Sequence, residues 1–343
     1  MNDKCVLVVG GAGYIGSHVC KALQMGGFTP VVYDNLSTGH SWAIQFGPAI
    51  VADLEDEPAL LKAFQEVEPQ AVIHLASLIN VRDSIANPAL YWENNLMGTL
   101  TLLKAMVKSN VRKLVFSSTA AVYGNPERLP IDEAHPKAPL NAYGKTKWAI
   151  EAMLQDFAHA HSLRFAALRY FNASGADPGG LIGEAHHPET HLIPLVIRTA
   201  LGLQKELLMY GDDFPTQDGT AIRDYVHVAD LADAHVRALQ ALEQETSLQL
   251  NLGTGKGYSV REIIRTVEQI GRQPVPVRLA PRLPHDSSML VADPTKAMKI
   301  LHWTPRMSDL PTIIQTAWNW ELKRSSSKLI LNELLSSGSV IKT

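Results

Sequence analysis

Cysteine is almost absent from this sequence: only Cys5 and Cys20 occur among its 343 residues. Cys5 lies in an apolar run that predicts a strand, and Cys20 lies in a segment that predicts a helix. Isolated cysteines of this kind are usually small core residues of a reduced protein. Two cysteines do not make the disulfide framework of a small secreted domain, so that class of protein is excluded.

A strong charge imbalance and long apolar runs are also missing. The net charge is −3 and no basic stripe is present, which argues against a nucleic-acid partner. No apolar run reaches the roughly 20 residues of a membrane-spanning helix, and the first residues lack the apolar core and cleavage site of a signal peptide. We therefore expect no membrane partner and a cytoplasmic location. With 46% apolar and 19% charged residues, the composition is that of a globular protein.

Short apolar runs rich in Val and Ile alternate with helical patterns in the first half of the chain. The predicted strands span residues 4–9, 30–33, 71–75, 113–117 and 163–170, and the predicted helices span 16–25, 57–67, 90–109 and 142–161. This alternation predicts an α/β fold of the Rossmann type, in which helices cover both faces of a doubly wound parallel sheet.

The pattern becomes irregular after residue 172, which predicts a smaller C-terminal subdomain. Loops rich in Gly, Pro, His or Asp are predicted at 174–189 and 211–224, helices at 191–203, 226–242 and 259–270, an extended segment at 272–284, and a tail at 326–343. Ser259 and Glu262 have the spacing of a capping box at the start of a helix.

A glycine-rich turn follows the first predicted strand. Gly10, Gly13 and Gly16 are spaced three residues apart before a predicted helix, where glycine lets the backbone approach a pyrophosphate at the helix N-terminus. Asp34 ends the second strand about 20 residues later, as in dinucleotide-binding folds. A carboxylate there accepts hydrogen bonds from a ribose 2′-hydroxyl and repels a 2′-phosphate. The expected cofactor is therefore NAD.

Asp53 follows another strand-like run, at 49–52, and leaves two interpretations open. Its carboxylate could accept a hydrogen bond from the adenine amino group of the cofactor, or it could cap the next helix. The sequence alone favours neither.

The helix predicted at 142–161 carries a candidate acid–base pair. Tyr143 and Lys147 are four residues apart and therefore share one helix face. A free tyrosine has a pKa of about 10 and is a poor base at neutral pH. A neighbouring ammonium group and a positively charged nicotinamide ring would stabilise the phenolate and lower that pKa. Tyr143 is therefore the expected general acid and base.

Hydroxyl side chains follow the strand predicted at 113–117. Ser117, Ser118 and Thr119 would lie at the carboxyl edge of the sheet, where open α/β folds bind ligands. One of these hydroxyls could hydrogen-bond the substrate oxygen that Tyr143 deprotonates, or the group could only satisfy turn amides. Spacing does not decide which hydroxyl acts.

Longer stretches of the chain resemble the UDP-glucose (UDP-galactose) 4-epimerases of the extended short-chain dehydrogenase/reductase family. They include GGAGYIGSH, YDNLSTG, FSSTAAVYG, YGKTK, RYFNASGA, ETHLIP and GTAIRDYVHVADLADAHV, and they keep the order of the family over roughly residues 5–320. The resemblance implies that Tyr143 is the catalytic base, Lys147 its partner and Thr119 the hydroxyl at the sugar O4. It also implies a UDP-sugar substrate and a homodimer paired through a four-helix bundle.

The resemblance further implies two binding units and their residues. Residues 1–172 and about 226–250 would bind NAD, and residues 173–225 and 251–325 would bind the nucleotide sugar. The implied NAD contacts are Gly10, Gly13, Tyr14, Ile15, Gly16, Asp34, Asn35, Leu36, Ser37, Thr38, Gly39, Asp53, Leu54, Leu75, Ala76, Ser77, Ile79, Asn94, Tyr143, Lys147 and Phe171. The implied substrate contacts are Thr119, Tyr143, Asn172, His191, Leu192, Leu208, Tyr210, Arg223, Arg282, Asp286 and Leu290.

The same resemblance argues against a nucleotide-sugar dehydratase. Those enzymes carry Thr-Asp-Glu after this strand, and the two carboxyl groups protonate and deprotonate the sugar ring. This chain has Thr119-Ala120-Ala121 instead, so the elimination would have no acid/base pair.

Three positions depart from the pattern of the epimerases. Leu283 stands where members often have an arginine that binds the diphosphate, and Arg282 could take over that role. Ile79 lies where some members place a lysine near the cofactor, and His191 lies where others have asparagine.

The expected reaction is transfer of a hydride from C4 of a UDP-hexose to NAD and its return to the opposite face. Leu290 falls where the family has a residue that limits the size of the sugar. Leucine is smaller than the tyrosine of some members, so UDP-glucose and UDP-galactose are the expected main pair, with weaker activity on the N-acetyl forms. The alternatives are a 4-epimerase of another UDP-sugar (N-acetylhexosamine, uronate or pentose) and a net NAD-dependent dehydrogenase or reductase.

Three histidines, His186, His187 and His191, lie close together in the loop predicted at 174–189 and just after it. Only Glu184 and Glu189 are nearby carboxylates, which is a weak pattern for a metal centre. The sequence therefore predicts no metal.

Overall fold

A seven-stranded parallel sheet forms the centre of the computed structural model, which describes residues 4–283 and 286–326. Its strands, in the order β10-β6-β5-β4-β1-β2-β3, are β10 (Ser247–Leu252), β6 (Arg164–Tyr170), β5 (Lys113–Thr119), β4 (Ala71–His74), β1 (Cys5–Val9), β2 (Thr29–Asp34) and β3 (Ala49–Val51). All neighbouring pairs are parallel. Because both faces of such a sheet are covered, its central strands are apolar on both sides. The predicted Rossmann-type fold is confirmed.

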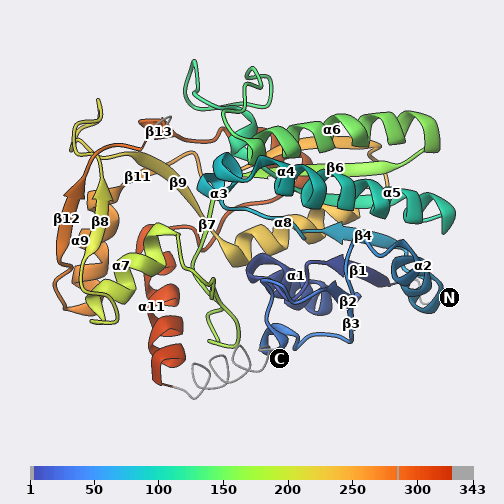
Figure 1. Cartoon of the computed structure of the whole chain (residues 1–343), viewed down its shortest axis with the longest axis horizontal. Coiled ribbons are helices and arrows are strands. Elements are labelled where there is room, and N and C mark those ends of the chain that lie inside the picture. The colour runs from blue at the N-terminus through green and yellow to red at the C-terminus, as the bar shows by residue number, and fades with distance from the viewer. Residues whose placement is uncertain (1–3, 284–285, 327–343) are drawn as a thin grey trace.

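Two apolar cores lie on the two faces of this sheet (Figure 1). Helices α1 (Tyr14–Met25), α8 (Val228–Ala241) and α10 (Thr295–Leu301) contribute to one core. Helices α2 (Glu57–Val67), α5 (Gly98–Lys108) and α6 (Ala142–His161) contribute to the other. Because the strands are held between these two cores, their carboxyl ends are fixed in position at one edge of the sheet. The loops that carry the expected cofactor and substrate residues begin at this edge.

A second, smaller lobe is built from the later part of the chain (Figure 1). Its strands are β7 (Asn172–Ser174), β8 (Leu207–Tyr210), β9 (Ile222–His227), β11 (Gly257–Ser259), β12 (Val277–Ala280) and β13 (Met289–Leu290). Strand β9 pairs with β7, β11 and β13, and β8 pairs with β12. Helices α7 (Leu192–Ala200), α9 (Val260–Gly271) and α11 (Leu310–Ser326) share a third core with β8.

Several element boundaries differ from the sequence-based predictions. The helix predicted at 90–109 is a composite of α4 (Pro88–Tyr91), a π-helical turn at Trp92–Met97 and α5, and it is preceded by an unpredicted helix, α3 (Val81–Ala86). The helix predicted at 191–203 ends at Ala200. The region predicted as loop at 211–224 already contains the start of β9.

Two predictions about helix starts have different outcomes. The helix predicted at 226–242 begins at Val228, because β9 continues through His227 and the His227 ring nitrogen Nδ1 then caps α8 by accepting a hydrogen bond from the Ala229 amide (3.0 Å). The capping box of Ser259 and Glu262 at the start of α9 is confirmed.

The division into an NAD-binding and a sugar-binding unit stays a proposal, and two segments differ in how they pack. Strand β10 joins the first sheet, in keeping with the assignment of residues near 226–250 to the NAD unit. Ala297, Leu301 and Trp303, by contrast, pack in the core of the first lobe although the proposal placed them in the second unit. The predicted tail at 326–343 lies outside the described residues except for Ser326, which ends α11. None of the helices in the described part of the chain is long and apolar enough to cross a membrane.

Candidate active site

The glycine turn after β1 is packed too closely for any side chain at two of its positions. Gly10 has φ +84°, and a Cβ there would lie 2.4 Å from the Ala76 amide nitrogen. A Cβ on Gly16 would lie 2.1 Å from the carbonyl oxygen of Gly10. Gly13 occupies the N-cap of α1 without a side-chain cap, so the first amides of that helix remain available to an anion. The turn therefore fits the pyrophosphate of a dinucleotide.

Asp34 lies directly beside this turn. One oxygen of its carboxylate accepts a hydrogen bond from the Ala12 amide (3.0 Å) and the other from the Leu36 amide (2.9 Å). The loop at 35–39 folds back over the turn, and the His40 amide donates to the Ala12 carbonyl (3.0 Å). A carboxylate held at this place suits a ribose with free hydroxyls and disfavours a 2′-phosphate.

The interpretation of Asp53 as a helix cap is wrong. The N-cap of α2 is Asp56, whose side chain accepts from the Ala59 amide (3.0 Å). The Asp53 carboxylate instead accepts a hydrogen bond from the Asn35 side-chain amide (2.8 Å). Asp53 therefore stays close to the loop expected to hold the adenosine half of the cofactor.

The loop after β4 is held by a residue that the sequence analysis did not single out. Asn95, in the π-helical turn, is buried, and its side chain accepts from the Leu78 amide (2.8 Å) and donates to the Leu78 carbonyl (3.1 Å). This fixes the segment at 75–79, which carries four of the expected cofactor contacts. The sequence contained a signal, the pair Asn94-Asn95, but only Asn94 was assigned.

Tyr143 and Thr119 meet at the carboxyl end of β5. Tyr143 is the second residue of α6, whose N-cap Asn141 accepts a hydrogen bond from the Gly144 amide (2.9 Å). Thr119 is the last residue of β5, and its side chain lies close enough to that of Tyr143 to lower the pKa of the tyrosine. Of the three candidate hydroxyls, Thr119 is thus the one beside the tyrosine. Ser117 instead contacts the Tyr170 hydroxyl, and Ser118 donates to Glu151 (2.5 Å).

Lys147 lies fully buried behind this pair. Its Nζ donates to the Ser117 carbonyl (2.8 Å) and lies 5.9 Å from the centre of the Tyr143 ring. Burial lowers the pKa of Lys147 to about 7. The ammonium form of Lys147 is therefore less favoured than in a free lysine, because desolvation disfavours the charged form.

The pKa of Tyr143 was expected to be lowered by the Lys147 ammonium and a nicotinamide cation together, and in the chain alone it is raised. Burial raises the pKa of Tyr143, and the hydrogen bond with Thr119 lowers it by less. The sequence could not reveal this, because desolvation depends on what packs around the ring. A positive charge brought by the cofactor would act against this shift.

A buried ion pair supports the end of β5 from behind. Arg169 on β6 contacts the Glu151 carboxylate through Nε (2.9 Å) and Nη2 (2.5 Å), and it also donates to the Tyr123 hydroxyl (2.9 Å). Glu151 accepts in addition from Ser118 (2.5 Å), the neighbour of Thr119. The network therefore joins β5, β6 and α6 close to Thr119 and Tyr143.

The second lobe brings the expected sugar-nucleotide residues to strand β9. Arg223 forms an ion pair with Asp286, and in the β9–β13 register it is the partner of Leu290. Its chain neighbour Asp224 is engaged elsewhere. The Asp224 carboxylate is buried and accepts from Thr254 through both the backbone amide (2.9 Å) and the hydroxyl (2.7 Å).

Arg282 lies in a different surrounding from Arg223. It forms an ion pair with Asp213 (2.5 Å), and its guanidinium lies 4.3 Å from the centre of the Phe214 ring. An open groove of about 510 Å³, lined by residues 211–213 and 279–282, includes this side chain. Arg282 is thus already engaged by a carboxylate and an aromatic ring.

Arg82 is a further residue that the sequence analysis did not assign. It is exposed on α3, and its guanidinium lies 4.7 Å from the centre of the Tyr210 ring on β8. Within residues 4–283 and 286–326, no carboxylate forms an ion pair with it. The contact joins the two lobes beside Tyr210, one of the expected substrate residues.

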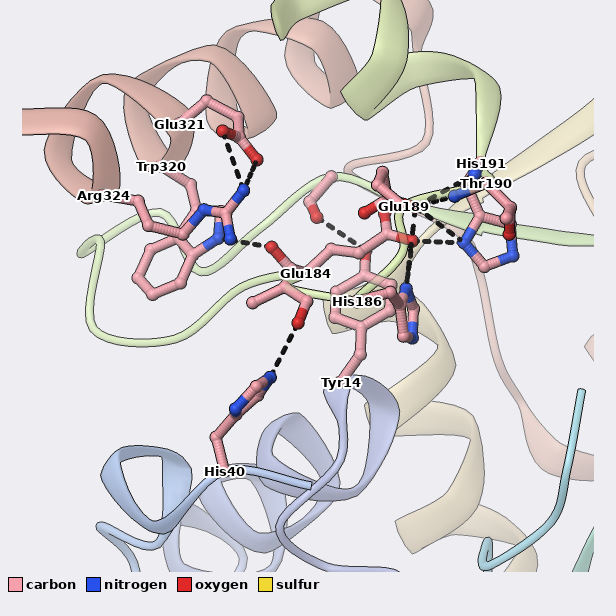
Figure 2. Close-up of polar contacts among 12 residues, drawn as sticks. Tyr14, His40, Glu184, His186, Glu189, Thr190, His191, Trp320, Glu321 and Arg324 are labelled. Atoms are coloured by element: carbon pink, nitrogen blue, oxygen red, sulfur yellow. Dashed lines mark hydrogen bonds and ion pairs between the residues drawn. The ribbon is translucent and has the colours of Figure 1, made fainter. Parts of the chain in front are cut away.

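His191 occupies the N-cap of α7, next to Leu192, at the edge of a polar cluster (Figure 2). Its Nδ1 contacts the Glu184 carboxylate (2.5 Å), which also contacts Nδ1 of His186 (3.1 Å). Burial lowers the pKa of His186, but hydrogen bonds to Glu184 and Glu189 outweigh it and raise the value to about 10. His187 is exposed and takes no part in the cluster.

Comparisons with known proteins agree with this geometry. Residues 6–253 match the model of the NAD dependent epimerase/dehydratase family. The UDP-glucose 4-epimerase of Rhizobium meliloti (strain 1021) is 47% identical over 326 residues, which cover 95% of this chain and 99% of that protein.

Solved structures give the same result. The UDP-glucose 4-epimerase of Brucella ovis in complex with NAD is 49% identical, with a TM-score of 0.89, and the match covers 92% of this chain and 98% of that one. The enzyme of Stenotrophomonas maltophila with NAD and formylated UDP-arabinopyranose is 40% identical, with a TM-score of 0.91, over 94% and 99%.

Proposed function

The chain belongs to the NAD-dependent epimerase/dehydratase family, and we propose that its preferred reaction interconverts UDP-glucose and UDP-galactose, as a step of galactose metabolism. It is an NAD-dependent UDP-sugar 4-epimerase. The observation that supports the proposed chemistry best is the contact of the Tyr143 side chain with Thr119, with Lys147 buried behind them. The preference for the hexose pair rests on Leu290.

The proposed mechanism uses Tyr143 to move one proton in each direction. Tyr143 takes the proton from the sugar O4 as C4 gives up its hydride, while the Thr119 hydroxyl holds the same oxygen. The glycine turn and Asp34 would hold NAD, which would supply the hydride chemistry at C4. The 4-keto sugar then turns over, and Tyr143 returns the proton when hydride reaches the other face of C4. The Lys147 ammonium favours the phenolate form of Tyr143.

One assay separates this reaction from its alternatives. The full chain is incubated with UDP-galactose and no added NAD, and both UDP-glucose and the absorbance of NADH are followed. We expect UDP-glucose without net NADH, because the cofactor is regenerated in each cycle. Accumulation of NADH would instead indicate a net dehydrogenase. A dehydratase is disfavoured because Ala120 and Ala121 carry no carboxyl groups.

Arg223 is proposed as the main anchor of the diphosphate. It lies on β9, beside Leu290 of β13. Position 283, where related epimerases often have a second arginine, is a leucine in this chain. A charge-assisted hydrogen bond to phosphate is worth about 1.5–3 kcal/mol. Arg223→Leu should therefore raise the dissociation constant of UDP roughly tenfold or more, as measured by titration calorimetry.

Arg282→Leu is the matched control for this prediction. The Arg282 side chain is 38% exposed at the open groove, whereas that of Arg223 is 14% exposed, so we expect removal of Arg282 to leave the UDP dissociation constant within about threefold. A large loss in Arg282→Leu together with no change in Arg223→Leu would assign the diphosphate to Arg282.

Leu290 is proposed to limit the size of the sugar. It packs against a cluster that contains Ile131 and three residues that directly follow Thr119, namely Ala120, Val122 and Tyr123. Leu290→Tyr should reduce epimerisation of UDP-N-acetylglucosamine by at least about tenfold and largely spare that of UDP-glucose. The larger sugar would be too tightly packed against the tyrosine, at a cost of about 1–3 kcal/mol. Product analysis with both substrates measures this ratio.

Leu290→Met, which nearly conserves volume, should leave the ratio of the two activities unchanged. If Leu290→Tyr instead lowers both activities equally, together with the melting temperature, Leu290 only fills the core.

A homodimer in the cytoplasm is also proposed. Trp92, Met97 and Trp148 are 37%, 51% and 46% exposed, and they belong to the π-helical turn before α5 and to α6. Exposed apolar groups of this size on packed helices are typical of an interface, and two helices from each copy would form a four-helix bundle. The buried, unpaired thiols of Cys5 and Cys20 agree with a reducing compartment.

A further inference from the structure

Four chelating side chains of one loop converge between β7 and α7 (Figure 2). Glu184, His186, Glu189 and His191 each offer one nitrogen or oxygen atom, and these four atoms lie within 4.8 Å of one another. The carboxylates are at the bottom of the cluster, with side chains 6% and 3% exposed, and the imidazoles cover them, with side chains 23% and 44% exposed. The carboxylates are thus shielded from water, and the imidazoles lie on the side of solvent.

The distances between the donor atoms suit a small tetrahedral cation. With metal–ligand bonds of about 2.0–2.2 Å, the ligand atoms of such a site are separated by about 3.4 Å. Oε1 of Glu189 lies 3.8 Å from Nδ1 of His186 and 3.6 Å from Nδ1 of His191. The corresponding distances from Glu184 are 3.1 and 2.5 Å. Of these four distances, the two from Glu184 are shorter than that separation, by less than about 1 Å.

A buried atom in the cluster has no partner. Oε2 of Glu189 forms no hydrogen bond within the described residues, although the side chain is only 3% exposed. The other oxygen, Oε1, accepts from the amides of Thr190 (2.8 Å) and His191 (2.9 Å). A buried carboxylate oxygen without a donor is costly. A cation bound at Oε1 would place a positive charge next to Oε2 of the same carboxylate and offset that cost.

The surroundings hold this loop in place. The Trp320 indole donates to the Glu184 carbonyl (2.8 Å), and a His40 ring nitrogen contacts the Ala185 carbonyl (2.6 Å). The Tyr14 ring meets the His186 ring edge-on, with centroids 6.3 Å apart. Metal ligands are typically oriented by contacts of this second layer. The arrangement is therefore preformed and does not require the loop to fold anew.

We propose that Glu184, His186, Glu189 and His191 form a structural site for one divalent cation of the zinc class. Two imidazole nitrogens and two carboxylate oxygens are the ligand set that Zn²⁺ accepts readily and that Mg²⁺ does not favour. The two carboxylates balance the charge of the ion. Tyr14, which contacts His186, lies within the glycine turn, and His191 is the N-cap of α7. The bound ion would therefore connect this loop to both the cofactor side and the sugar side of the protein. It takes no part in the hydride transfer.

Titration calorimetry of the full chain with ZnCl₂, with MgCl₂ in parallel, tests this site by binding alone. We expect one Zn²⁺ per chain, no saturable binding of Mg²⁺, and a melting temperature that rises with Zn²⁺. His186→Ala should weaken Zn²⁺ binding by at least about 10–100-fold. Glu189→Gln is the second variant, because it keeps the shape of the side chain and removes one charged ligand. It should weaken binding in the same direction.

His187→Ala is the matched control, since His187 is exposed in the same loop but outside the cluster. It should bind Zn²⁺ like the parent chain. The proposal is overturned if the parent chain binds no Zn²⁺, if His186→Ala and Glu189→Gln bind it as tightly as the parent, or if His187→Ala loses as much affinity as His186→Ala. Melting curves without Zn²⁺ establish that each variant is folded, and the result does not depend on whether the epimerase assay succeeds.

Discussion

Replacement of Tyr143 by phenylalanine is expected to lower kcat for UDP-galactose by at least about 10²-fold while NAD remains bound, because the variant lacks the group that moves the O4 proton. The ring of Tyr143 would stay in place, so the loss should fall on kcat and much less on KM. Single-turnover measurement of hydride transfer, together with the amount of NAD released on denaturation, separates lost chemistry from lost cofactor.

Tyr170→Phe is the control for this variant. Tyr170 is also a buried tyrosine, and it pairs with Thr119 in the β5–β6 register. Its hydroxyl hydrogen-bonds Ser117 and no other side chain in the part of the protein that the structure describes. We expect its removal to change kcat by less than about tenfold, as for the loss of one neutral hydrogen bond. Near-normal epimerisation by Tyr143→Phe would show that another group moves the proton and would contradict the mechanism.

Replacement of Arg169 by methionine is expected to destabilise the protein by about 3–5 kcal/mol. Arg169 and Glu151 are almost fully buried, with side chains 5% and 7% exposed. Removal of the guanidinium leaves the Glu151 carboxylate inside the protein with Ser118 as its remaining donor. Denaturant unfolding followed by circular dichroism measures the change in free energy.

Two further variants test the cause of this loss. Arg169→Met combined with Glu151→Leu should recover part of the stability, because the double variant buries no unpaired charge. Arg128→Met, which removes an exposed pair with Asp132 (2.9 Å), should cost less than about 1 kcal/mol. If Arg169→Met is as mild as Arg128→Met, the buried network contributes little to stability.

The fold was largely predictable from the sequence, because the strands of a buried parallel sheet are continuous apolar runs. The helices at Glu57–Val67 and Ala142–His161 have the predicted bounds. The short strands of the second lobe were missed. Strand β9 reads Ile-Arg-Asp-Tyr-Val-His, where charged residues interrupt the apolar pattern. Its identity as a strand follows from pairing with β7, β11 and β13, which lie far away in the sequence.

The candidate site was predictable where its geometry is local. The spacing of Tyr143 and Lys147 along one helix is an example. Contacts between distant segments were not predictable. Arg223 and Asp286 are 63 residues apart, and Arg82 meets Tyr210 across the two lobes. The raised pKa of Tyr143 was missed for a related reason, since burial results from the whole fold.

The position of β10 at the edge of the first sheet has a consequence for synthesis of the chain. Strand β10 pairs with β6, yet it ends at Leu252, more than eighty residues after Tyr170. While the ribosome is adding those residues, β6 is an unprotected edge strand. The sheet face that α8 and α10 later cover is still exposed to solvent. A nascent chain that pauses in this interval exposes both an open edge and an apolar face to its neighbours. Chaperone binding, and aggregation when chaperones are scarce, should therefore concentrate between the emergence of β6 and that of α10.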